Sequence, residues 1–437
     1  PCGNVAKRFA IMIFEDIEAP RSPDEARCIG INRNRECARF CGSGCVAKSC
    51  RATVRFCGSI AGLRLSMMNA FFYTEKFFAY DYGASHPLKI ERLRLTYDLC
   101  KAYDLFSLPD TALMEARPAS ESEILRYHTP EYVEVLKSAS SGRTGGDFSY
   151  GLGPGDNPVF PGLWEWSQLH TGASLQCAEL VSEGKVNIAF NIAGGLHHAG
   201  ARKASGFCYV NDPVLAICHL VDKGRRVLYL DIDAHHGDGV QWAFYEDPRV
   251  LTVSFHQDAR TLFPGTGGLG EIGHGEGLGY SVNIPMLPGT DDHVFWEGFD
   301  SVVPVLTERF NPDVVVSQLG VDTFLNDPLA ALELTTNGFC KAIAYLTERG
   351  LPWVALGGGG YNPANVAKAW TLAWAMMNGV ELPDELPKAM LKPLSAVGWR
   401  GEKLRDPEHQ SPWQEKCRSR MQECLEYVET EIFPKIR

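Results

Sequence analysis

Short runs of β-branched and apolar residues, separated by amphipathic stretches, recur along most of this chain. The runs lack the strict alternation of half-exposed strands, and most are followed by Gly, Pro or Asp, which is typical of strands buried on both faces. Strands that alternate with helices in this way predict an α/β fold with three layers, a mainly parallel sheet covered by helices on both faces. The expected strands are Val186–Ile192, Arg226–Asp231, Val250–Phe255, Tyr280–Ile284, Asp313–Gln318 and Trp353–Leu356.

Apolar residues at helical spacing predict the elements that cover this sheet. A length of 437 residues suggests about two or three domains. The chain contains no internal repeat and no low-complexity tract, however, so one large α/β domain is the simpler interpretation. The expected helices are Pro87–Tyr103, Thr129–Ser138, Thr171–Gly184, Pro213–Lys223, His293–Phe310, Thr335–Gly350 and Pro363–Asn378.

The first 66 residues differ in composition from the rest. They hold 7 of the 14 cysteines and none of the 12 histidines, and they carry +5 of a net charge of −11, which leaves −16 for the remainder. A zinc or iron–sulfur site at Cys37, Cys41, Cys45 and Cys50 fits the known spacings poorly, and a disulfide framework would need an oxidising compartment. We expect residues 1–66 to be a basic, cysteine-rich leader that is not a folded domain, followed by the folded domain at 67–437, which begins with an aromatic strand.

Composition excludes several classes of protein. A hydrophobic fraction of 45% with 22% charged residues is ordinary for a globular protein, and a pI near 5.6 argues against binding nucleic acid by bulk charge. No apolar run approaches the roughly 18 residues of a membrane helix, and Pro1–Arg8 lacks the layout of a secretory signal. We expect a cytoplasmic protein that binds neither nucleic acid nor membrane, with the seven remaining cysteines mostly as core thiols.

Unusual polar residues follow four of the expected strands. In open α/β sheets ligands bind beyond the carboxyl ends of the strands. A single His or Asp there usually caps a turn, but residues of this kind at four strand ends indicate a functional site. They are His197 and His198 after the first strand, Asp231, Asp233, His235 and Asp238 at the second, Asp322 after the fifth, and Tyr361 after the glycines of the sixth.

These residue types favour metal-dependent hydrolysis. Asp233 and His235 are two residues apart and project to the same side of an extended chain, and Asp322 completes a set of three that leaves a position open for water or substrate. Oxygen and nitrogen ligands suit zinc, although iron(II) or manganese is chemically possible. The His197–His198 pair would then transfer protons.

The remaining strand-end residues fit supporting roles in the same chemistry. Asp231 and Asp238 are available to orient the two imidazoles, which makes a histidine a competent base. Tyr361 can donate a hydrogen bond to a developing oxyanion. Together the residues predict hydrolysis of a carbonyl compound.

From about Phe71 to Pro363 the chain resembles the class I-type histone deacetylases, and within that superfamily most of all the bacterial acetoin-utilisation deacetylases. Each matching motif is fairly specific, and their order makes the resemblance strong. The motifs are His86–Arg92, Asn157–Phe160, Gly194–His198, Ser205–Asp212, Asp231–Gly239, Phe263–Gly267, Gln318–Asp322 and Gly357–Tyr361.

The resemblance implies an arginase–deacetylase fold with one catalytic zinc. It assigns the metal ligands to Asp233, His235 and Asp322, the set that spacing already indicates. It assigns the active-site histidines to His197 and His198, partnered by Asp231 and Asp238, and the transition-state tyrosine to Tyr361. The family's aromatic tunnel for the acyl-lysine stem falls on Phe207 and Phe263, with Gly206 accepting a hydrogen bond from the substrate amide.

The resemblance also implies further sites. A structural monovalent cation, K⁺, would be bound through Asp231, Asp233, His235, Ser254 and Phe255. Arg92 matches an arginine of the internal cavity through which acetate leaves, although it could also be an ordinary surface charge. The family's rim aspartate, which grips the substrate backbone, has no clear counterpart; Asp147 lies in the corresponding loop, but the local sequence departs from the family pattern.

We therefore expect a zinc-dependent hydrolase that removes acetyl groups from acetyl-lysine side chains of proteins and releases acetate. An acetylpolyamine amidohydrolase on the same fold is the main alternative. A two-metal enzyme similar to arginase and a catalytically silent protein that recognises acetyl-lysine fit the motifs less well. Bacterial relatives point to a metabolic enzyme such as an acyl-CoA synthetase as the acetylated substrate. The oligomeric state stays open.

Overall fold

The computed structural model describes residues 68–436. The predicted leader, with its cysteine candidates Cys37, Cys41, Cys45 and Cys50, lies outside the described residues. The seven cysteines within them are all free thiols, five of them buried, which agrees with their expected place in the core.

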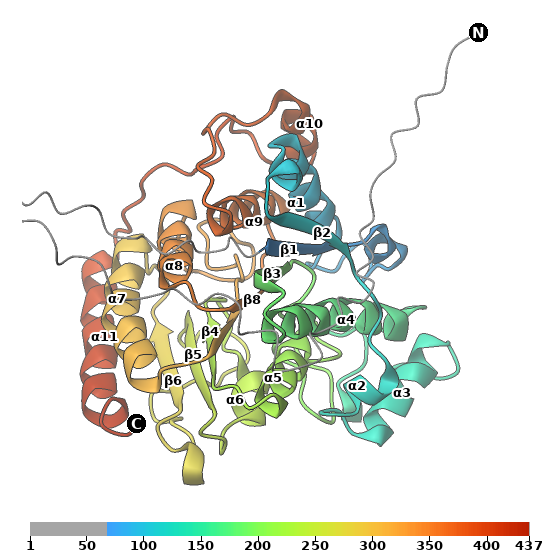
Figure 1. Ribbon diagram of the computed structural model, residues 1–437, viewed down its shortest axis with the longest axis horizontal. Coiled ribbons are helices and arrows are strands. Elements are labelled where there is room, and N and C mark those ends of the chain that lie inside the picture. Colours follow the sequence, from blue (N-terminus) through green and yellow to red (C-terminus); the bar gives the residue numbers. More distant parts are fainter. Residues whose placement is uncertain (1–67, 437) are drawn as a thin grey trace, which may run out of the picture. The chain divides into compact units, whose positions relative to one another are not determined.

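A single sheet of eight parallel strands forms the centre of the fold (Figure 1). The strand order is β2-β1-β3-β8-β7-β4-β5-β6. The central strands β8, β7 and β4 are buried along their whole length, as in a sheet covered on both faces. The strands are β1 Met68–Tyr73, β2 Thr111–Glu115, β3 Val186–Asn191, β4 Val227–Asp231, β5 Val250–Gln257, β6 Ser281–Met286, β7 Val314–Gln318 and β8 Trp353–Leu356.

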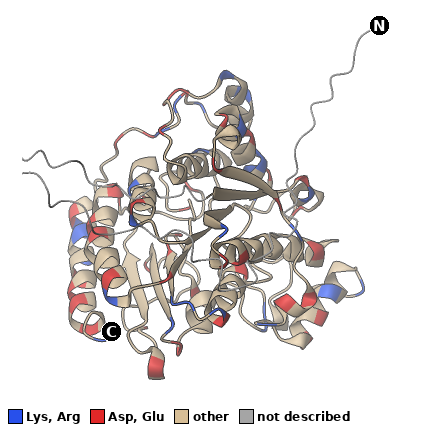
Figure 2. Ribbon diagram, in the orientation of Figure 1, with Lys and Arg blue, Asp and Glu red and all other residues tan. Residues whose placement is uncertain are grey.

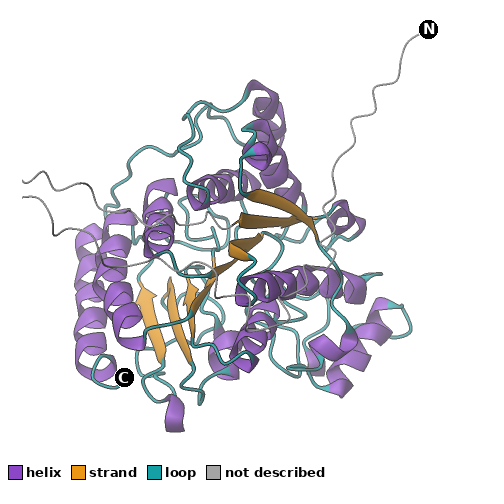
Figure 3. Ribbon diagram, in the orientation of Figure 1, coloured by secondary structure: helices purple, strands orange, loops and turns teal. Residues whose placement is uncertain are grey.

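Two layers of helices enclose the sheet, so the predicted three-layer α/β architecture is confirmed (Figure 3). Helices α4 and α5 pack together on one face, and α1, α9, α8 and α7 follow one another in contact on the other. The helices are α1 Glu91–Ala102, α2 Glu121–Ile124, α3 Pro130–Ser140, α4 Leu163–Ser182, α5 Asp212–Asp222, α6 Asp238–Ala243, α7 Asp292–Phe310, α8 Thr336–Arg349, α9 Pro363–Met377, α10 Lys388–Ala396 and α11 Gln414–Tyr427, with short 3₁₀ or π turns η2 Glu75–Ala79, η3 Leu105–Ser107, η4 Phe148–Tyr150, η5 Gly275–Gly277 and η6 Val428–Ile432.

The elements that depart from the expected pattern have physical reasons. Strand β2 was not predicted because its sequence, Thr-Ala-Leu-Met-Glu, forms a half-exposed edge rather than a buried run. Helix α4 begins at Leu163 and not at Thr171, because its first turns are rich in tryptophan and buried nearly all round, which hides the helical period.

The C-terminal helix α11 completes the domain. It packs against α7 and the edge strand β6, where the side chain of Met421 fills the space left by Gly298. The outer side of this helix carries both basic residues and glutamates (Figure 2). None of the helices in residues 68–436 has the length and apolar character needed to cross a membrane.

The strand order also decides where the site lies. Strands β3, β8, β7 and β4 are neighbours in the middle of the sheet. They are the four strands whose carboxyl ends carry the polar residues singled out in the sequence. All run parallel, so these ends meet at one edge of the sheet.

Candidate active site

Asp233, His235 and Asp322 come together at the ends of β4 and β7, as their spacing predicts. One ligand atom from each lies within 4.8 Å of the others, and all three residues are buried. His235 Nδ1 lies 3.1 Å from Asp233 Oδ1 and 3.0 Å from Asp322 Oδ2. Two carboxylate oxygens and an imidazole nitrogen that converge in this way are a donor set for a divalent cation.

The second oxygen of each carboxylate is held by the surrounding fold. Asp233 Oδ2 accepts hydrogen bonds from Gln318 Nε2 at 2.6 Å and from the Gly359 N–H at 2.8 Å. Asp322 Oδ1 accepts one from the Ala234 N–H at 2.8 Å. These contacts orient both carboxylates so that their other oxygens face His235. A Cβ at Gly359 would collide with both carboxylates, so only glycine fits there.

The charges of the three residues are strongly coupled. Burial and the neighbouring charge of Asp233 raise the pKa of Asp322 to about 7. Burial alone would lower the pKa of His235, but hydrogen bonds and charge from Asp233 and Asp322 raise it to about 10. Asp233 and Asp322 thus favour positive charge between their carboxylates, and a divalent cation bound there would supply it. The residues present therefore fit a metal.

His197 and His198 each have a carboxylate as the hydrogen-bond partner of Nδ1, as predicted. His197 Nδ1 lies 2.7 Å from Asp231 Oδ2, and His198 Nδ1 lies 2.7 Å from Asp238 Oδ1. The two Nε2 atoms are 3.0 Å apart, so one proton is shared between them. Asp231 is itself oriented by the Tyr229 hydroxyl, which donates at 2.6 Å.

The two imidazoles differ in their affinity for that proton. Burial lowers the pKa of His197, but the charges of Asp231 and Asp233 outweigh it and raise that pKa to about 9. For His198, burial and the positive charge of His197 lower the pKa, and Asp238 offsets this only in part. His197 is accordingly the protonated member of the pair and His198 the neutral one, available as a base.

The turn that presents the histidines is clamped by the start of α5. Asn211 Nδ2 donates to the carbonyls of His197 at 3.0 Å and Ala199 at 2.9 Å. Asp212 accepts from the N–H groups of Gly195 and Leu196. Because Asn211 also caps α5 through the Val214 N–H, one dipeptide fixes both the helix and the histidine turn.

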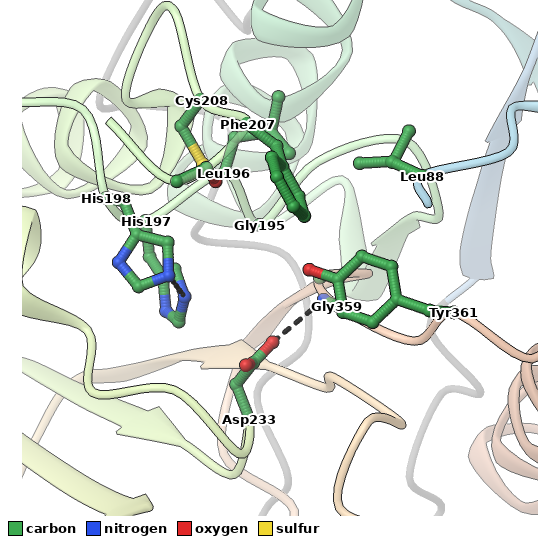
Figure 4. A pocket seen from close by; sticks show the side chains of 12 residues that line it. Leu88, Gly195, Leu196, His197, His198, Phe207, Cys208, Asp233, Gly359 and Tyr361 are labelled. Atoms are coloured by element: carbon green, nitrogen blue, oxygen red, sulfur yellow. Dashed lines mark hydrogen bonds between the residues drawn. The ribbon is translucent and has the colours of Figure 1, made fainter. Parts of the chain in front are cut away.

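Tyr361 reaches the site from the glycine-rich turn after β8. Figure 4 shows its ring beside Phe207 with the hydroxyl pointing into the space between Asp233 and the histidines. Its backbone N–H donates to Asp327 Oδ2 at 2.8 Å, and Asp327 Oδ1 accepts from Leu329, which ties this turn to the one after β7. Burial raises the pKa of Tyr361 well above its usual range, so the phenol stays protonated and able to donate.

The side chains enclose a narrow pocket with about 20 Å³ for water-sized groups. His197, His198, Asp233 and Tyr361 line it together with Leu88, Leu196 and Phe207 (Figure 4). Its mixed polar and apolar lining suits an uncharged stem that ends in a polar reacting group.

The predicted tunnel residues lie at the mouth of this pocket. The Phe263 ring lies 5.0 Å from that of His198, and the Phe207 ring lies 5.6 Å from that of Tyr361. Gly206 lies between Phe263 and His198, where a Cβ would collide with both. Phe207 has a positive φ of 69°, a strained conformation for a non-glycine residue and one that occurs at functional sites.

Arg92 is buried, with 4% of its surface exposed, so it is not the surface charge that the sequence left possible. Its Nη1 donates to the Gly360 carbonyl at 2.9 Å, directly behind Tyr361. Burial lowers the pKa of its guanidinium. This location agrees with the internal position that the resemblance implies.

The predicted monovalent-cation residues are also neighbours. Asp231, the last residue of β4, is the register partner of Ser254 within β5, and Phe255 follows Ser254 on this buried strand. The donors expected of this site include backbone carbonyls, so K⁺ binding stays a prediction.

Of the two aspartates near the mouth of the pocket, Asp156 and not Asp147 has a carboxylate open to the surface depression. The carboxylate of Asp147 accepts from the Ser149 N–H and hydroxyl, and so serves to cap η4. Asp156 is exposed and lines a depression that it shares with Gly206. The sequence did not indicate the places of Asp156, Gln318 and Asp327, which follow from contacts made in the folded chain.

Comparison with known proteins agrees with this geometry. Residues 86–377 match the family model described as the histone deacetylase domain. The chain is 40% identical over 324 residues to histone deacetylase RPD3 of Saccharomyces cerevisiae, covering 73% of each protein. It is also 40% identical over 328 residues to acetoin utilization protein AcuC of Bacillus subtilis, covering 73% of this chain and 84% of AcuC. The crystal structure of a histone deacetylase homologue from Aquifex aeolicus superposes with a TM-score of 0.75 at 36% identity, over 82% of this chain and all of that one.

Proposed function

This chain belongs to the histone deacetylase family, and we propose that it is a metal-dependent hydrolase that removes acetyl groups from lysine side chains of proteins. One observation carries the proposal. Asp233 of the metal ligand set, the His197–His198 pair and Tyr361 all line one narrow pocket together with the aromatic ring of Phe207, and His235 and Asp322 lie directly beside Asp233. An uncharged acetyl-lysine loses little hydration in such a pocket, whereas a free lysine ammonium would lose much more.

Asp233, His235 and Asp322 would hold the metal, and its positive charge would polarise the acetyl carbonyl and acidify a water molecule. His198, the neutral imidazole, takes the proton of the water that attacks the carbonyl carbon. The Tyr361 hydroxyl donates to the carbonyl oxygen as it becomes negative. His197, the protonated imidazole, gives its proton to the departing lysine nitrogen, and acetate and the lysine amine are released.

Zinc is the metal we propose, because two carboxylate oxygens and one imidazole nitrogen are donors of the kind that hold catalytic zinc. Iron(II) is the alternative with the same ligand preference. K⁺ beside Asp231 would be structural. Arg92, which is buried and bonded to the Gly360 carbonyl, would act on the internal path by which the resemblance implies that acetate leaves.

The proposed substrate is an acetylated protein. By analogy with bacterial relatives, we propose a metabolic enzyme such as an acyl-CoA synthetase. The exposed ring of Phe263 and the open depression beside Gly206 leave room for a polypeptide at the mouth of the pocket, which supports a protein substrate. A cytoplasmic location is part of the same proposal.

The test compares two substrates with the zinc-loaded protein. We expect acetate release from an acetyl-lysine peptide with a much higher kcat/KM than from N-acetylputrescine. The Tyr361→Phe variant, which keeps every metal ligand, should retain zinc and lose about two to three powers of ten in kcat. Faster hydrolysis of N-acetylputrescine would favour the polyamine alternative, and parental turnover by Tyr361→Phe would remove the tyrosine from the mechanism.

A further inference from the structure

A second depression adjoins the catalytic pocket. This rim groove, with a volume of about 350 Å³, is bounded by Phe148, Gly153–Asn157 and Ala204–Gly206. Gly206 lines both the rim groove and the catalytic pocket. A substrate chain that places one side chain in the catalytic pocket therefore has neighbouring residues within reach of the rim groove. In an extended backbone each further residue lies about 3.3 Å along the chain.

Phe148 is the most exposed large apolar side chain in residues 68–436, with 77% of its surface accessible. Isolated exposed apolar residues are common and need no function. This ring, however, is held in place. It packs on Gly153, where a Cβ would collide with it, and Gly151 of the same turn approaches the Ala204 carbonyl so closely that only glycine fits. The capping bonds of Asp147 fix the turn from the other side.

The charges around the rim groove favour a cation. Asp156 is the one charged residue among those that line it, and Asp147 directly precedes Phe148. Arg143, the basic residue of the same loop, donates hydrogen bonds to Ser141 Oγ and Glu134 Oε1. Arg202 and Lys203 precede Ala204 but do not line the groove, and the Lys203 stem lies near Gly200. A held aromatic face beside a carboxylate binds guanidinium or ammonium groups.

We propose that the rim groove binds an Arg or Lys side chain next to the acetyl-lysine of a polypeptide substrate, with the cation on the Phe148 ring. The inference rests on the proposed function and adds the sequence preference of the substrate. Phe148 is thus a specificity-determining residue outside the reacting centre.

The experiment uses acetyl-lysine peptides that differ at one residue on either side of the acetyl-lysine. Arginine is compared with citrulline, its uncharged isostere, and with leucine and glutamate. For the zinc-loaded full chain we expect kcat/KM to be about two- to five-fold higher with arginine than with citrulline on one side, the size of an exposed cation–π contact. Phe148→Leu should abolish this ratio, and Phe148→Tyr should keep it.

Trp413→Ala, which removes an exposed aromatic residue of the C-terminal segment, is the matched control and should leave the ratio unchanged. Equal rates for arginine and citrulline in the parent, a preference for leucine, or an arginine preference that survives Phe148→Leu would each overturn the inference while deacetylation itself stands. Turnover of N-acetylputrescine but of no peptide would instead overturn the proposed function.

Discussion

His197 and His198 are adjacent in sequence and carry the same side chain, yet their pKa values shift in opposite directions. The pKa of His197 rises to about 9 beside Asp231 and Asp233, and that of His198 falls through burial and the charge of its neighbour. Since a base must be neutral and an acid protonated, the pair can serve both proton transfers of an amide hydrolysis. A metal at Asp233 adds positive charge and lowers both values, which keeps His198 neutral.

Removal of the charge at Asp238 tests the assignment of His198 as the base and His197 as the acid. Asp238 raises the pKa of His198, so Asp238→Asn should lower that pKa further. The acid limb of kcat/KM, which reports protonation of the base, should then move to lower pH. The pH-independent value of kcat/KM should fall at least about tenfold, because the base is weaker and its ring less well oriented. The fall should not exceed the whole contribution of a general base, about 10² to 10⁴ in rate.

The control is Asp222→Asn, a surface carboxylate paired with Arg126, which should leave the profile unchanged. An acid limb that moves to higher pH in Asp238→Asn would contradict the assignment of His198 as the base.

At the scale of elements, the site depends on the turns after β3 and β8, which are held in place by hydrogen bonds from neighbouring segments. The histidine turn after β3 is clamped by Asn211 and Asp212 at the start of α5, and the tyrosine turn after β8 is tied to the turn after β7 through Asp327. The strands supply the positions, and these cross-connections supply the orientation of the side chains.

The clamp predicts a joint loss of stability and activity. Asn211→Ala removes the cap of α5 and two buried donors, and it leaves the carbonyls of His197 and Ala199 without their partner. We expect the free energy of unfolding, measured with urea, to fall by about 2–4 kcal/mol and kcat to fall with it. Thr129→Ala, which removes only the cap of α3, should cost about 1 kcal/mol and leave kcat unchanged. An Asn211→Ala protein with the stability of Thr129→Ala and full activity would refute the clamp.

At the scale of the whole molecule, most of the fold could be predicted because six of the strands, β3 to β8, are short, buried, apolar runs that alternate with amphipathic helices. The half-exposed edge strand β2 and the first turns of α4 carry no clear period and were missed. The metal and proton-transfer residues could be predicted because unusual residue types follow adjacent strands. Gln318, Asp327 and Asp156 could not, since their roles come from contacts between segments far apart in sequence.

Metal titration of the chelated protein tests the central claim, a hydrolase with one metal at Asp233, His235 and Asp322, most directly. Acetate release from an acetyl-lysine peptide should rise in proportion to added Zn²⁺ and saturate at one ion per chain. Asp322→Ala should neither retain zinc nor regain activity. Saturation at two ions per chain, activity that survives chelation, or stoichiometric zinc in Asp322→Ala would contradict the account.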